Sequence, residues 1–102
     1  MGDRGQILMK KSGVYLYSHW GGSELNKIVK SALRQKLRWD DVEYLTRIIF
    51  CEMIKEDVAG ETGFGIGTKE HRDNEHPIVI VDTDTQTVRI GKTKKTFQEF
   101  IK

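Results

Sequence analysis

The chain has 102 residues, of which 37% are hydrophobic and 31% are charged. This length suits one domain with a single core, and the apolar pattern that recurs along the chain argues against disorder. The longest apolar runs are too short to cross a bilayer, and residues 1–4 lack the apolar stretch of a secretory signal. We therefore expect a cytoplasmic protein with no membrane partner.

The formal net charge of +2 hides a segregation of charge along the chain. Residues 1–38 contain eight Lys or Arg and two acidic residues, residues 39–84 contain four and twelve, and residues 85–102 contain five and one. If the basic ends meet in the fold, they form a face that attracts polyanions. If they interleave with the acidic middle, the charges only solvate the surface, and we favour this second interpretation.

Two short strands are predicted at the start of the chain, at residues 6–11 and 14–19. With Ser12 and Gly13 as a two-residue turn, the paired residue numbers sum to 25, so Arg4 lies opposite Gly21. One side of this hairpin is apolar and carries Ile7, Met9, Val14 and Leu16, and the other carries Tyr15, Tyr17 and His19.

Two helices follow, because residues 23–37 and 40–56 both show the apolar spacing of a helix that is buried on one side. Ser23 is the predicted N-cap of the first helix, and Asp40 with Glu43 resembles a capping box at the start of the second. The link between the helices is too short for a crossover, so we expect them to be antiparallel or sharply angled neighbours. Cys51, the only cysteine, lies among apolar residues, which predicts a buried thiol.

After residue 60 the apolar period changes to two, which predicts strands at residues 63–68, 77–82 and 87–90. Residues 77–82 are apolar on both faces and form the best candidate for a central strand. Residues 91–95 are interpreted as a basic connector and 96–102 as a short terminal helix. The order ββααβββα predicts a single α+β domain with a mainly antiparallel sheet and helices packed on one face.

The most specific segment is residues 15–23, where a strand runs through His19 into a glycine turn that opens a helix. Glycines let the backbone approach a ligand, and the free amides of a helix start favour phosphate or carboxylate. Our leading hypothesis is a site for a small anionic, phosphate-bearing ligand. Its predicted residues are Arg4, His19, Trp20, Gly21, Gly22 and Ser23. The structural alternative is an Asp3–Arg4 ion pair with glycines that only turn the chain.

His19 is also the candidate for proton transfer, because histidine changes its charge near neutral pH. No nucleophile lies in a recognised catalytic setting, so whether the protein is an enzyme stays open, and no cofactor is identified. His71 and His76 with Asp82 or Asp84 have the residue types of a metal site. Their spacing matches no metal motif, and we predict no metal site there.

Two other functions are kept as alternatives. Exposed tyrosine and tryptophan side chains, with the charged loop at residues 69–76, would suit a protein-interaction or inhibitor module. A nucleic-acid-binding protein is the second alternative, with Tyr15, Tyr17 and Trp20 as stacking residues and a basic set of Lys27, Lys30, Arg34, Lys92, Lys94 and Lys95. Edge strands at residues 6–11 or 87–90 would also allow pairing between copies of the chain.

The segments Gly2-Asp3-Arg4-Gly5 and Val14-Tyr15-Leu16-Tyr17-Ser18-His19-Trp20-Gly21-Gly22 resemble those of a group of short uncharacterised prokaryotic and viral proteins. The likeness extends loosely to residues 38–41 and 62–66. No established activity, ligand or catalytic residue belongs to that group, so the resemblance assigns no role to any position.

Overall fold

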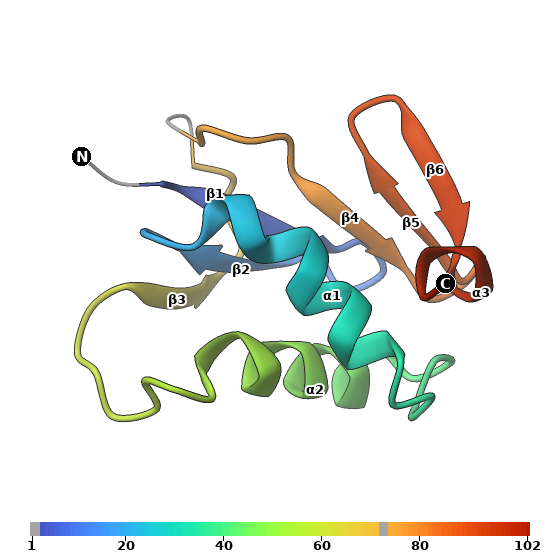
Figure 1. Ribbon diagram of the computed structural model, residues 1–102, viewed down its shortest axis with the longest axis horizontal. Helices are drawn as coiled ribbons and strands as arrows, with labels where there is room; N and C mark the ends of the chain where they lie inside the picture. Colours follow the sequence, from blue (N-terminus) through green and yellow to red (C-terminus); the bar gives the residue numbers. More distant parts are fainter. Residues whose placement is uncertain (1–2, 72–73) are drawn as a thin grey trace.

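A computed structural model describes residues 3–71 and 74–102, and its strands form one sheet in the order β3-β2-β1-β4-β5-β6 (Figure 1). Neighbouring strands are antiparallel except β1 and β4, which are parallel. The strands are β1 (Gly5–Met9), β2 (Val14–Ser18), β3 (Phe64–Gly67), β4 (Val79–Asp82), β5 (Thr87–Ile90) and β6 (Thr93–Thr96). The predicted α+β class with a mainly antiparallel sheet is confirmed, and β4 takes the predicted interior place.

The helical elements are η1 (Gly22–Glu24), α1 (Leu25–Leu33), α2 (Val42–Ile54) and α3 (Phe97–Phe100). Figure 1 shows α1 and α2 over one face of the sheet, with α3 beside the ends of β5 and β6. The core lies between these layers, since residues that alternate along the strands meet the apolar stripes of both long helices. Its fully buried members include Ile7, Met9, Leu16, Val29, Leu33, Leu45, Ile49, Val81 and Phe97. Among the described residues, no helix is long and apolar enough to cross a membrane.

The register of the first hairpin differs from the predicted one. The paired numbers sum to 23, so Ile7 faces Leu16 and Met9 faces Val14. The turn spans residues 10–13, where Ser12 and Gly13 donate their N–H groups to the Met9 carbonyl and Gly13 has φ +74°. A shift of two residues keeps every side chain on its predicted face, but it removes the expected alignment of Arg4 with Gly21.

Other local predictions were also wrong, among them Ser23 as an N-cap, because Ser23 lies inside η1 and its hydroxyl donates to Asp3. The first helix ends at Leu33 because the chain turns into left-handed conformations at Lys36 and Arg38. The second is capped by Asp41 and not Asp40, since the Asp41 carboxylate accepts from the N–H groups of Glu43 and Tyr44. The predicted basic connector contains a sixth strand, β6, which pairs with β5. In addition, Cys51 is exposed and not buried.

The connection from β3 to β4 crosses the sheet face opposite α1 and α2. Its backbone and Asn74 are held by Gln6, which accepts from the His71 N–H at 2.9 Å and donates to the Lys69 carbonyl at 3.2 Å. Only 1% of Gln6 is exposed as a result. The predicted charged loop therefore covers one end of this face, although Arg72 and Asp73 lie outside the described residues.

Candidate functional site

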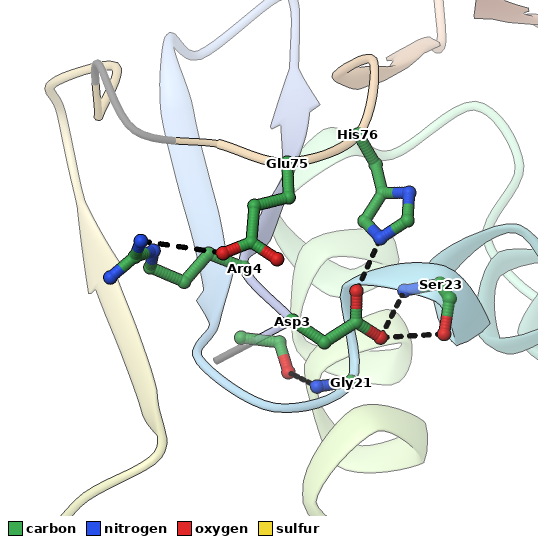
Figure 2. Close-up of polar contacts among 7 residues, drawn as sticks. Asp3, Arg4, Gly21, Ser23, Glu75 and His76 are labelled. Carbon is green, nitrogen blue, oxygen red and sulfur yellow. Dashed lines mark hydrogen bonds and ion pairs between the residues drawn. The ribbon is translucent and has the colours of Figure 1, made fainter. Parts of the chain in front are cut away.

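The start of the first helix is held by a carboxylate of the protein itself. Ser23 donates to Asp3 Oδ2 twice, from its backbone N–H at 3.0 Å and from its hydroxyl at 2.6 Å. The His76 ring bonds the other Asp3 oxygen, as Figure 2 shows. The hydrogen bonds from Ser23, and then the one from His76, lower the pKa of Asp3 from 3.8 to about 2. Asp3 thus lies where an external anion was expected to bind.

The remaining amide groups of this turn also have acceptors. The Gly21 N–H donates to Ser18 Oγ at 2.9 Å, and the Gly22 N–H donates to the Asp3 carbonyl at 2.6 Å. The Glu24 N–H donates to the Gly21 carbonyl at 3.0 Å. Since the helix start is internally satisfied, an external anion would have to displace Asp3 before it could use these donors.

Gly22 is needed because two backbone segments cross at this point. A Cβ atom at Gly22 would lie 2.6 Å from the Asp3 carbonyl oxygen and 2.7 Å from the Arg4 carbonyl carbon. The segment before β1 could not approach η1 if Gly22 carried a side chain. Close chain packing therefore accounts for this glycine without a ligand.

The structure separates the other predicted binding residues. Arg4 forms an ion pair with Glu75 at 3.3 Å, and its guanidinium points away from Ser23 (Figure 2). His19 bonds the Tyr17 hydroxyl through Nδ1 at 2.9 Å. The sequence did not assign Asp3, Ser18 and His76 to the helix start. The preference of a helix start for negative charge was the signal that could have identified Asp3.

The two histidines of the loop, His71 and His76, contact different residues. His76 bonds Asp3, whereas the His71 ring lies 4.5 Å from the Tyr17 ring, centroid to centroid. Among the residues that the structure describes, no group of three or more His, Cys, Asp or Glu is placed to hold a metal ion.

Several basic side chains of the N-terminal segment pair with acidic ones, and among the described residues Lys27 is the member of the proposed nucleic-acid-binding set that does so. Lys27 lies 3.4 Å from Glu24, and Arg34 donates to the Ile101 carbonyl at 2.9 Å. In the first hairpin, Lys10 and Lys11 lie beside Asp82 and Asp84 at 3.7 and 3.1 Å. The basic N-terminal segment thus meets acidic residues from the middle of the chain.

A second candidate surface is a groove beside Trp20, which we call the Trp20 groove. It has a volume of about 470 Å³ and is lined by Trp20, Ile28, Glu52, Met53, Lys55, Glu56, Asp57 and Phe64. Trp20 is 59% exposed, and its ring lies 2.8 Å from the position of a Cβ on Gly63, which has φ +101°. The groove is on the helix side of the sheet, whereas Tyr15 and Tyr17 lie on the opposite side, so these aromatic residues do not share one face.

Comparison with known proteins gives no relative. No protein-family model, no curated protein and no solved structure matches the chain. Only geometry and chemistry therefore distinguish the two candidate surfaces, the Asp3-capped helix start and the Trp20 groove.

Proposed function

We propose that the protein is a small protein-interaction module and that the Trp20 groove is its contact surface. The observation that carries this proposal is the exposure of Trp20, 59% of which is accessible at a groove that is also lined by the apolar residues Ile28, Met53 and Phe64. Tryptophan is among the residues that contribute most binding energy at interfaces. Exposed apolar surface of this kind is characteristic of contact sites.

Two further exposed apolar residues lie in segments that also supply residues of the groove. Ile66 on β3 is 61% exposed, and Val58 in the connection between α2 and β3 is 71% exposed. Both belong to segments that also supply groove residues, Phe64 from β3 and Asp57 from the connection. Burial of exposed apolar side chains by a partner lowers the free energy of the complex.

The groove is favoured over anion binding because it needs no internal group to leave. An anion at residues 21–23 would compete with the Asp3 carboxylate and its bonds to Ser23 and His76. A partner at the groove meets Trp20 together with Lys55, Glu56 and Asp57, which are already exposed.

The test is capture of partners from a lysate of the source cells with the wild-type chain, Trp20→Ala and Tyr44→Ala. Tyr44 is an exposed aromatic residue of α2 that does not line the groove, so it provides the matched control. We expect the wild type and Tyr44→Ala to retain one partner, and calorimetry with that purified partner to show at least ~30-fold weaker binding by Trp20→Ala. Equal affinity of the folded Trp20→Ala variant, or no specific partner for the wild type, would contradict the proposal.

A further inference from the structure

We propose that β3 is the site at which a partner adds a strand. The partner is an extended segment with alternate apolar residues at its centre and basic residues at its ends. This inference rests on the proposed interaction function and specifies how the partner binds. Strand addition provides affinity through backbone hydrogen bonds and specificity through the alternate side chains.

The two edges of the sheet differ in their protection. Figure 1 shows β3 and β6 as the border strands, so the prediction of edge strands at residues 6–11 or 87–90 was wrong, because these residues form the interior strands β1 and β5. The β6 edge carries Lys94 and Lys95 and is exposed along its whole length, and lysines on an edge oppose pairing with other chains. The β3 edge reads Phe-Gly-Ile-Gly and has no charge and no proline. Only the β3 edge lacks these common features that discourage pairing.

The backbone groups of β3 show which residues are available. The His19 N–H donates to the Gly63 carbonyl at 2.8 Å, and in an antiparallel pair such bonded positions alternate with unbonded ones. Gly65 and Gly67 therefore bond toward β2, whereas Phe64 and Ile66 direct their N–H and C=O groups outward. Outside the strand ladders, none of the hydrogen bonds among residues 3–71 and 74–102 involves Phe64 or Ile66. An incoming strand thus meets two donors and two acceptors.

The side-chain geometry connects this edge to the Trp20 groove. Ile66 pairs with the buried Leu16, so the side chains of Phe64 and Ile66 lie on the helix side of the sheet. The partner residues directly opposite Phe64 and Ile66 lie on the same face, beside the groove. Apolar residues are therefore favoured at these positions of the partner. On the other face, a Cβ atom at Gly65 or Gly67 would meet nothing within 4 Å, so the alternate partner side chains have room.

The charge around the groove determines the rest of the partner. Lys55 is engaged by Glu52 at 2.6 Å, whereas no ion pair among the described residues includes Glu56 or Asp57. These two carboxylates favour basic residues that flank the apolar centre of the partner. A second copy of β3 would bring no charge to meet them, so a basic segment fits better than self-pairing.

The probe is a fluorescein-labelled synthetic peptide, Lys-Lys-Ile-Ser-Val-Lys-Lys, titrated by fluorescence anisotropy and by amide NMR. We expect the amide signals of residues 64–67 and the Trp20 indole signal to shift. Ile66→Pro loses both the side chain and an outward N–H, so it should bind at least tenfold more weakly than Ile66→Ala, which loses the same side chain but keeps that N–H. Lys94→Pro is the matched control, because the Phe97 N–H donates to the Gln86 carbonyl and the same alternation places Lys94 outward on β6.

Two altered peptides keep the test independent of protein variants. Methylation of the Ile and Val backbone nitrogens should abolish binding to the wild-type chain, and replacement of Lys by Glu should weaken it at least tenfold. Loss of binding in Trp20→Ala but not in Ile66→Pro would overturn strand addition and leave the interaction function standing. Unchanged binding in both variants would overturn both proposals. A dimer in size-exclusion chromatography that Ile66→Pro dissociates would overturn the peptide partner in favour of a second copy.

Discussion

Asp3 acts as an internal ligand of the helix that begins at residue 22. Its carboxylate receives two hydrogen bonds from Ser23 and one from His76, the same donors that an external phosphate would use. The sequence predicted the attraction of this turn for negative charge. It did not predict which group provides that charge, because Asp3 is 20 residues from Ser23 and 73 from His76.

The lowered pKa of Asp3 makes its contribution to stability depend on pH. The folded protein lowers this pKa from 3.8 to about 2, so the contribution is present above 3.8 and is lost as the pH falls through 2. Asp3→Asn removes the charge, and we expect its melting temperature to lie below that of the wild type at neutral pH. The gap should shrink as the pH is lowered from about 4 to about 2.

Calorimetry across this pH range checks the prediction. Asp84→Asn is the control, since its carboxylate meets the exposed Lys11 and takes no part in the helix start. A gap between wild type and Asp3→Asn that stays constant down to the lowest pH would show that Asp3 acts by shape and not by charge.

Removal of the Asp3 carboxylate should create the anion site that the sequence suggested. Asp3→Ala leaves the Ser23 N–H and hydroxyl without their acceptor, so sulfate should raise the melting temperature of this variant more than that of the wild type, which sulfate stabilises only through its general exclusion from protein surfaces. Thermal melts in sodium sulfate and in sodium chloride of equal ionic strength measure the difference. Equal stabilisation of the wild type and Asp3→Ala by sulfate would show that removal of the Asp3 carboxylate creates no anion site.

The link between α1 and α2 shows why element boundaries were hard to predict. Leu37 continues the apolar spacing of the first helix, but the chain leaves the helix after Leu33 and passes through positive φ at Lys36 and Arg38. The Trp39 indole donates to the Leu33 carbonyl at 3.1 Å and packs edge-on against Phe97. The Trp39 side chain thus satisfies a carbonyl at the end of the helix, and the link contains no glycine of the kind that usually marks such an end.

Lys36→Gly should stabilise the protein by roughly 0.5–1 kcal/mol, because glycine adopts a φ of 56° without the steric cost that lysine incurs. Urea unfolding measures this change. Lys30→Gly is the matched control within α1, where glycine should destabilise by roughly 1 kcal/mol. Destabilisation by Lys36→Gly would show that the lysine side chain stabilises the turn more than its backbone strain costs.

The sixth strand was missed for a different reason. Residues 93–96 are exposed at every position and contain no apolar alternation, so nothing in their own pattern predicts a strand. They are extended because they pair with β5, from Thr87–Thr96 to Ile90–Thr93. By contrast, β4 was predicted as an interior strand because residues 77–82 are apolar on both faces of the strand.

At the scale of the whole molecule, the fold class could be predicted and the polar contacts could not. Apolar residues that recur every 3.6 residues in helices and every 2 residues in strands indicate which side of each element is buried. The buried sides then determine how the helices pack on the sheet. The hairpin register depends on turn geometry at residues 10–13, and an error of two residues there misplaced Arg4. The basic and acidic segments are separate along the sequence but come together in the fold, where Lys10 and Lys11 lie beside Asp82 and Asp84.

The parallel pairing of β1 with β4 constrains the order in which the chain can fold. β1 lies between β2, its immediate successor, and β4, which begins at Val79. During synthesis the β1–β2 hairpin and the two long helices emerge while one edge of β1 still lacks its partner. The sheet is therefore completed only by a contact between distant parts of the chain, and such contacts slow folding. Until Val79–Asp82 docks, the edge of β1 is open to other chains, so late residues protect an early strand from aggregation.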